Sequence, residues 1–233
     1  MRILEILRDW AEVWAMLIPL SIILFYKPAG NHIRIVVGYV IIAFFLFLIA
    51  NLMLEFYDIL PERLLVNGGI NNNLIYNIHS VIKVLLFSWY IMSVRDYKYL
   101  NFLKLLLVVY LGFVILNFYQ WETPLKLSTH LFTAESIVLL VMCFFYFFRS
   151  IQDDSQENWL KHPSFLVCSG VCLYEVICFF IFLFFWPLAE SDEPFFIVTM
   201  RIYSFALVLL GIMLALAFYK SHRANIQLKQ VAT

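Results

Sequence analysis

The chain has 233 residues, of which 64% are hydrophobic and only 14% are charged, and its formal net charge is zero. A soluble domain carries charge on about a quarter of its residues and is about half apolar. The simplest solvent for this excess of apolar surface is a lipid bilayer. Because the chain has no basic surplus, we do not expect nucleic acid as a partner.

Seven apolar runs are long enough, or nearly long enough, to cross a bilayer as helices, which takes about 20 residues each. The sequence therefore predicts an all-α, polytopic bundle in a single transmembrane domain, residues 1–233, with helices at 10–26, 35–57, 73–93, 102–118, 125–148, 164–186 and 195–219. The fourth run is the weakest. Most prolines lie at the ends of runs, where the first helical N–H has no partner anyway. Pro19 lies inside a run and predicts a kink in the first helix.

The basic residues predict the orientation, because cytoplasmic segments carry an excess of Lys and Arg. With the N-terminus outside and the C-terminus in the cytoplasm, the cytoplasmic segments contain Lys27, Arg34, Arg95, Lys98, Lys104, Arg149, Lys161, Lys220, Arg223 and Lys229. The outer segments contain Arg2, Arg8, Arg63 and Lys126, and the loop before the last helix contains Glu190, Asp192 and Glu193. No connection is long enough for a second domain, so we expect any sensed signal to leave through a partner chain.

An internal repeat is also compatible with the sequence. A shift of 120 residues places the first run on the fifth, the third on the seventh, and Glu55 on Glu175. Helices one to three and five to seven would then be parallel repeats joined by helix four, as in some transporters. Chance alignment of apolar helices is the alternative interpretation.

Ionisable residues inside the apolar runs are the candidate ligand-binding residues, because a charge at the bilayer centre costs several kcal/mol. With the predicted orientation, they gather between the middle and the outer half of the membrane: Glu55, His79, Lys83, His130, Glu135, Glu175 and Arg201. Acids and bases nearly balance, so we expect pairing across helices. Two interpretations stay open. The pairs either pin helices together, or they line an outward-facing cavity for a small polar or ionic ligand.

The sequence offers little support for a metal site or an enzyme. Cys168, Cys172 and Glu175 share one face of the sixth helix, but they form an incomplete ligand set, and packing of small cysteines is the simpler interpretation. We expect no metal and no cofactor. No P-loop, dinucleotide fingerprint or Gly-x-Ser-x-Gly element occurs. The last helix has neither a lysine for a retinal Schiff base nor the paired histidines of seven-helix zinc hydrolases. We therefore assign no catalytic residue.

Several short elements of the second half carry a resemblance. They are Ala134-Glu135-Ser136-Ile137, the phenylalanine-rich helix end at 144–148, Leu160-Lys161-His162-Pro163-Ser164-Phe165 and Gly170-Val171-Cys172-Leu173-Tyr174. Together they resemble uncharacterised bacterial seven-transmembrane proteins that are similar to the membrane regions accompanying sensor histidine kinases. Those proteins often have Pro-x-Trp where this chain has Pro-Ser-Phe. The resemblance implies a sensory or accessory role in a bacterial inner membrane and carries no catalytic residue.

Three hypotheses of function follow. The first is a receptor or accessory sensor that binds a small polar or ionic ligand in an outward-facing intramembrane pocket and signals through a cytoplasmic partner protein. The second is a small secondary transporter or channel that uses Glu55 and Glu175 as coupling carboxylates. The third is a membrane-embedded enzyme acting on lipid, which would need a metal at His79, His130 or the cysteines. In each case the protein is a multi-pass protein of the cell membrane.

Overall fold

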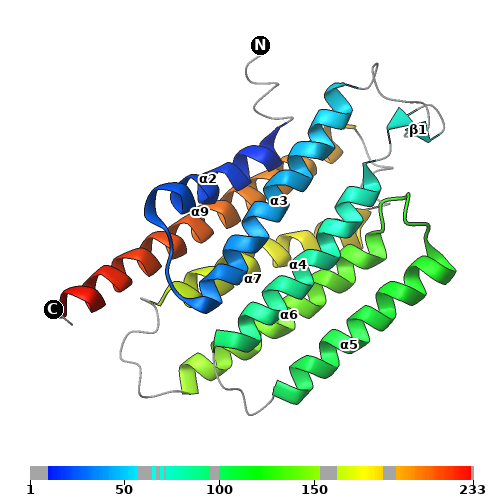
Figure 1. The fold of residues 1–233 in the computed structure, drawn as a ribbon. Coiled ribbons are helices and arrows are strands. Elements are labelled where there is room, and N and C mark those ends of the chain that lie inside the picture. Colours follow the sequence, from blue (N-terminus) through cyan, green and yellow to red (C-terminus); the bar gives the residue numbers. More distant parts are fainter. Residues whose placement is uncertain are drawn as a thin grey trace.

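The computed structural model describes residues 10–56, 65–66, 69–70, 72–94, 100–152, 162–185 and 193–231. These residues form a bundle of helices (Figure 1): α2 (Ala11–Tyr26), α3 (Asn31–Glu55), α4 (Asn73–Val94), α5 (Leu100–Leu116), α6 (Thr129–Gln152), α7 (Pro163–Leu183) and α9 (Glu193–Val231). Within the described residues, 6 helices are long and apolar enough to cross a membrane, and the shorter α2 is apolar as well. The prediction of a helical membrane bundle is confirmed.

The helix boundaries differ from the predicted ones in two ways. Helix α6 spans Thr129–Gln152 rather than residues 125–148, because residues 125–128 belong to the loop before it, and polar residues extend two other helices. Helix α3 already begins at Asn31, and α9 has 39 residues, which corresponds to about 58 Å at 1.5 Å per residue. That length exceeds a hydrocarbon core of about 30 Å. Hydropathy identifies the part of a helix that suits lipid but does not detect a polar continuation of the same helix. The lengths predicted for α3 and α9 were therefore too short.

The connection between α3 and α4 contains the extended segments of the described chain. Strands β1 (Leu65–Val66) and β2 (Gly69–Ile70) have two residues each and pair antiparallel. Several charged residues used for the orientation lie outside the described residues, namely Arg2, Arg8, Arg63, Arg95, Lys98, Lys161, Glu190 and Asp192.

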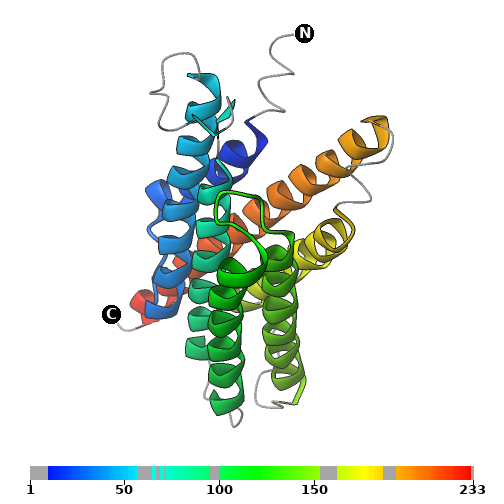
Figure 2. The ribbon, with the colours of Figure 1, turned by 90° about the vertical axis from the view of Figure 1, so that its right-hand side faces the viewer.

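Contacts between neighbouring helices form a ring. Helix α2 packs against α3, α3 against α4, α4 against α6, α6 against α7, α7 against α9, and α9 again against α2. Helix α5 lies outside this ring, against α6 and α4, and Figures 1 and 2 show it at the edge of the bundle. A parallel repeat joined by the fourth helix would produce this order of helices. The repeat itself stays a prediction.

Helix α5 presents a wide apolar surface to its surroundings. It buries Leu103 and Tyr110, whereas Val108, Val109 and Ile115 are each at least 60% exposed. In a bilayer such a surface contacts lipid tails, which are as apolar as the side chains themselves. The short π-helix η3 (Asn117–Trp121) continues α5 and leads into the loop before α6.

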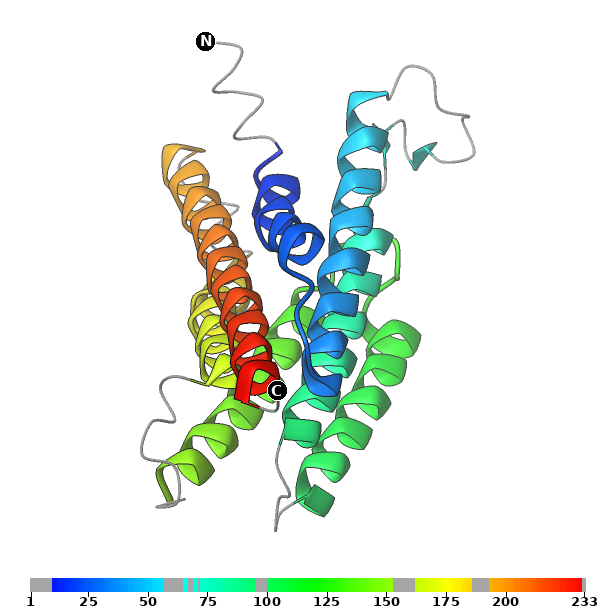
Figure 3. The same cartoon turned by 60° about the vertical axis from the view of Figure 1, so that its left-hand side comes forward.

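Helix α2 lies between α9 and α3 (Figure 3) and packs most extensively on α9. A Cβ atom placed on Gly211 of α9 would collide with the backbone carbonyl oxygen of Ala15 in α2. Small residues allow such close approach of helix backbones in membranes. Helix α2 then ends at Tyr26, with Lys27 in the left-handed conformation at φ 38°, and Gly30 at φ 108° precedes α3. Glycine suits that position because it has no Cβ.

Candidate functional site

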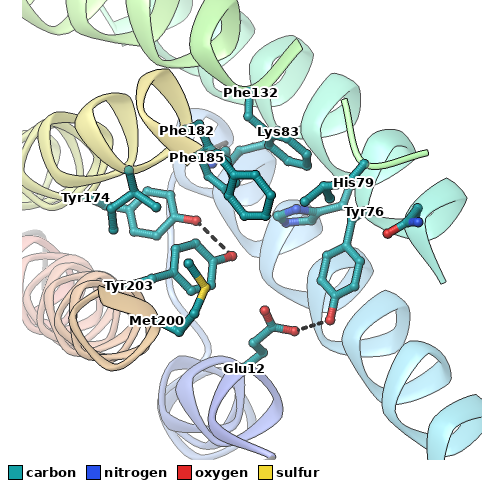
Figure 4. Close-up of a pocket in the computed structure, with 13 residues that line it drawn as sticks. Glu12, Tyr76, His79, Lys83, Phe132, Tyr174, Phe182, Phe185, Met200 and Tyr203 are labelled. Atoms are coloured by element: carbon teal, nitrogen blue, oxygen red, sulfur yellow. Dashed lines mark hydrogen bonds between the residues drawn. The ribbon is translucent and has the colours of Figure 1, made fainter. Parts of the chain in front are cut away.

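A cavity of about 190 Å³ lies in one half of the bundle (Figure 4). We call this half the cavity end. It is the end at which α2, α4, α6 and α9 begin and α7 finishes. Residues of all five helices and of the loop before α6 line the cavity: Glu12, Asn73, Tyr76, His79, Lys83, Leu127, Phe132, Tyr174, Ile181, Phe182, Phe185, Met200 and Tyr203. The lining is mostly aromatic and aliphatic with a few polar groups, which is typical of sites for small molecules.

One side of the cavity is formed by a carboxylate and tyrosine hydroxyls. The Tyr76 hydroxyl donates a hydrogen bond of 2.7 Å to Oε2 of Glu12, and Tyr203 lines the same cavity. Tyr174 donates to the hydroxyl of Tyr203 at 3.4 Å. Figure 4 shows the Glu12 carboxylate pointing from α2 into the space between Tyr203 and Tyr76. An ionised carboxylate only accepts hydrogen bonds, so phenol donors suit it.

The other polar side of the cavity is an ion cluster built on Lys83. Its ammonium group forms ion pairs with Glu135 of α6 and with Oε1 of Glu175 of α7, the latter at 2.9 Å. The hydroxyl of Ser136 donates to Oε2 of Glu175 at 2.8 Å. Lys83 also lies over the ring of Tyr174, 4.3 Å from its centroid. All three charged side chains are at most 4% exposed, so this cluster is buried between three helices.

His79 lies one turn before Lys83 on the same face of α4. The Nε2 atom of its ring is 3.3 Å from the hydroxyl of Tyr39 on α3, and its ring packs on Phe47 with centroids 4.6 Å apart. The spacing of Tyr76, His79 and Lys83, three and four residues apart, aligns them along α4. Helical periodicity therefore places these three residues on one face of α4.

The structure brings together His79, Lys83, Glu135 and Glu175, but not the other candidates. Glu55 is exposed in the last turn of α3, and Arg201 is exposed on α9. The side chain of His130 is 64% exposed and forms an ion pair with Glu122 at 3.0 Å rather than with the buried acids. The expected pairing of Arg201 with a buried glutamate is therefore absent from the described structure, because rotation about α9 turns the neighbouring Met200 towards the cavity instead.

Two buried asparagines fix the loop that closes the bundle beside the cavity. The amide of Asn77 donates to the carbonyls of Pro124 and Lys126, at 2.9 and 2.8 Å, and its oxygen accepts the N–H of Ser128 at 3.2 Å. Asn117 of η3 donates to the hydroxyl of Ser128 at 2.9 Å. These two side chains therefore position the start of α6.

Sequence reasoning missed Glu12 and Tyr203. Glu12 falls just inside the first apolar run, and an acid at that position is a signal of its own. Tyr203 lies two residues after Arg201, and tyrosine in an apolar run is too common to single out. Both residues reach the cavity only through the packing of α2 and α9 against the other helices, which the sequence does not reveal.

The cysteines do not form a metal site in the described structure. All four are free, and three of them are buried. Among the described residues, no group of three or more His, Cys, Asp or Glu side chains converges on a point that could hold a metal ion. Glu175, which shares a helix face with Cys168 and Cys172, is instead engaged with Lys83 and Ser136.

The apolar helices define the class: this is a multi-pass helical membrane protein. No protein-family model, curated protein or solved structure matches the chain. The resemblance to membrane regions that accompany sensor kinases stays a prediction.

Proposed function

We propose that this protein is a seven-helix membrane receptor or accessory sensor that binds a small ligand in the cavity and signals through a partner protein. The observation that carries the proposal is that α2 and α9 line the cavity at one end and contact each other again at the opposite end. Glu12 and Tyr203 face the cavity. Far along the same helices, the rings of Tyr26 and Tyr219 lie 5.3 Å apart.

These two helices supply a route from the ligand to the far end of the bundle. Between the two contact points, Gly211 packs against the backbone of Ala15, so α2 and α9 are in close contact at mid-length. Beyond them, the hydroxyl of Ser221 donates to the carbonyl of Ala29 in the turn before α3. A ligand that changes the distance between Glu12 and Tyr203 would move both helices together. Signalling then requires that the ligand binds one arrangement of the helices more tightly than the other.

The distribution of basic residues supports an outward-facing cavity. In the described structure, the end opposite the cavity carries Lys27, Arg34, Lys104, Arg149, Lys220 and Arg223, and Lys126 lies in the loop at the cavity end. Cytoplasmic ends of membrane proteins are enriched in such residues. This distribution supports a cavity that faces the outside and an end of α9 in the cytoplasm, where a partner protein would bind it. The proposed location is a bacterial inner membrane.

Transport is the second candidate, and the ring of helices with α5 outside supports it. The packing on the far side of the ion cluster argues against a continuous path. There the space between helices is filled by large side chains at most 2% exposed, among them Phe87, Tyr90, Tyr146 and Phe218. Glu55, one of the two coupling carboxylates of this hypothesis, is exposed at the end of α3. The lipid-acting enzyme gains no support from the described residues, which form no metal-binding group.

The test is a purification of the tagged protein from its native cells in mild detergent, followed by mass spectrometry. We expect a signalling protein in stoichiometric amount. A matched variant, Lys220→Glu with Arg223→Glu, should lose this partner, because Lys220 is only half-buried and Arg223 is exposed at the end of the bundle opposite the cavity. The opposite result is wild-type protein that is recovered without a partner and carries a solute flux in liposomes. If Glu175→Gln abolishes that flux, the protein is a transporter and not a receptor.

A further inference from the structure

The cavity combines an acid that has no basic partner among the described residues with walls of aromatic rings. Two charged residues line it, Glu12 and Lys83. Lys83 is already held between Glu135 and Glu175. Glu12, in contrast, makes no ion pair with another described residue and accepts a hydrogen bond from the Tyr76 hydroxyl. A negative charge in a low-dielectric environment is costly unless a cation lies near it.

The rings around the cavity are suited to a cation. Phe132 and Phe182 stack with centroids 4.6 Å apart, and Phe182 is 6.1 Å from the ring of Tyr203 and 6.4 Å from that of Phe185. The faces of aromatic rings attract cations, and cages of such rings recognise organic ammonium ions. The position of Lys83 over Tyr174, at 4.3 Å, is an example of this contact within the site itself.

The size of the cavity limits the ligand. The cavity has a volume of about 190 Å³. A large cofactor exceeds this volume, whereas a short-chain amine fits. A small anion beside Glu12 would meet a group of the same charge, and repulsion between like charges is strong at low dielectric.

We propose that the ligand of this cavity is a small organic ammonium ion, with its charge beside Glu12 and its carbon atoms against the rings of Phe132, Phe182 and Tyr203. This inference rests on the proposed function, because it names the chemical class of the receptor's ligand. Glu12 acts as the counter-ion, and Tyr76 positions the Glu12 carboxylate through its hydrogen bond. Lys83 stays paired with Glu135 and Glu175, so it does not compete with the ligand for Glu12.

The experiment uses probes of equal shape and different charge. Choline is compared with neohexyl alcohol, its uncharged carbon isostere, and with tert-butylacetate, the anion of similar shape. Isoamylamine is compared in the same way with isoamyl alcohol and isovalerate. Binding to the purified full chain in detergent is measured by calorimetry and by the shift in melting temperature, up to ~10 mM probe, which covers affinities in the weak, millimolar range. We expect at least one ammonium probe to bind about tenfold or more tighter than its neutral and anionic partners.

Variants then test whether Glu12 causes the preference for ammonium probes. Glu12→Gln keeps an acceptor for Tyr76 but removes the charge, so it should lower ammonium affinity by about tenfold or more and make the charged and neutral probes bind alike. Glu55→Gln removes an exposed carboxylate of α3 and should change nothing. If Glu12→Gln does not fold, Tyr203→Phe and Tyr203→Leu serve instead. The phenylalanine keeps the ring and most of the affinity, whereas the leucine loses the ring and the ammonium preference.

Two results would overturn the inference. One is a neutral or anionic probe that binds the wild type as tightly as its ammonium partner, and the other is the absence of binding by every ammonium probe. With either result, the receptor proposal is still tested separately, by whether a partner protein is recovered in the purification. Conversely, the protein could prefer ammonium probes, have no partner protein and carry a solute flux. That result would refute the receptor proposal but support the inference that the ligand is an organic ammonium ion.

Discussion

Gly211 of α9 lies against the backbone carbonyl of Ala15 in α2, at the point where α2 has lost a helical hydrogen bond. Residue 19 is a proline and has no N–H, so the Ala15 carbonyl lacks the donor that normally follows four residues later. The close approach of the glycine Cα–H group offers this carbonyl a weak hydrogen bond. Pro19 and Gly211 are thus two parts of one helix contact.

The first prediction concerns this contact. Gly211→Ala should lower the free energy of unfolding by about 1–3 kcal/mol, because the added methyl group collides with backbone rather than with a movable side chain. Gly112→Ala is the matched control, since a Cβ atom at position 112 of α5 meets nothing within 4 Å. Thermal unfolding of both variants in mild detergent checks the prediction. Equal stability of the two variants would show that α2 and α9 are not in close contact.

The second prediction concerns the charge of Lys83. Lys83→Met leaves Glu135 and Glu175 buried without a cation, and the loss of one partner of a buried ion pair costs about 3–5 kcal/mol. The triple variant with Glu135→Gln and Glu175→Gln should recover most of that stability, because it removes the uncompensated acids as well. Lys104→Met on the exposed side of α5 is the control. Unfolding in detergent measures the stability of all these variants. A triple variant that is no more stable than Lys83→Met would contradict the ion pairs of Lys83 with Glu135 and Glu175.

The third prediction separates the hydrogen bond of Ser136 from the ion pair of Glu175. Ser136→Ala should cost about 1.5–3 kcal/mol, the usual range for a hydrogen bond to a charged group. Glu175→Gln should weaken the bundle or its ligand response, because Lys83 then keeps only Glu135. In a double-mutant cycle the two changes should cost less together than the sum of the single variants. Additive effects would mean that the two side chains do not interact.

The fourth prediction concerns the loop before α6. Asn77→Ala removes three hydrogen bonds to residues 124, 126 and 128, so amide hydrogen exchange across this loop should accelerate. We expect a loss of about 1–3 kcal/mol in unfolding free energy, since buried groups of the loop lose their partners. Asn101→Ala, exposed on α5, serves as the comparison. Unchanged exchange in the loop would show that another contact holds it.

Much of the fold was predictable from the sequence, because it depends on composition along the chain. A long apolar run in lipid must form a helix to satisfy its own backbone hydrogen bonds. The helical spacing of Tyr76, His79 and Lys83 predicted their common face. The depth of the charges was also predictable, since the position of a residue along its helix gives its height in the bundle.

The partners of these charges were decided by the tertiary structure. Successive residues on a helix point about 100° apart, so a small rotation of α9 exposes Arg201 and turns Met200 and Tyr203 inwards. Helix rotation and the order of helices around the ring arise from close packing, such as that of Gly211 on Ala15, which hydropathy does not encode. The sequence by itself determined that buried acids and bases lie in one half of a helical membrane bundle. Only the packing of α2, α4, α6, α7 and α9 decided that Lys83 is shared by two glutamates and that Glu12 faces the cavity.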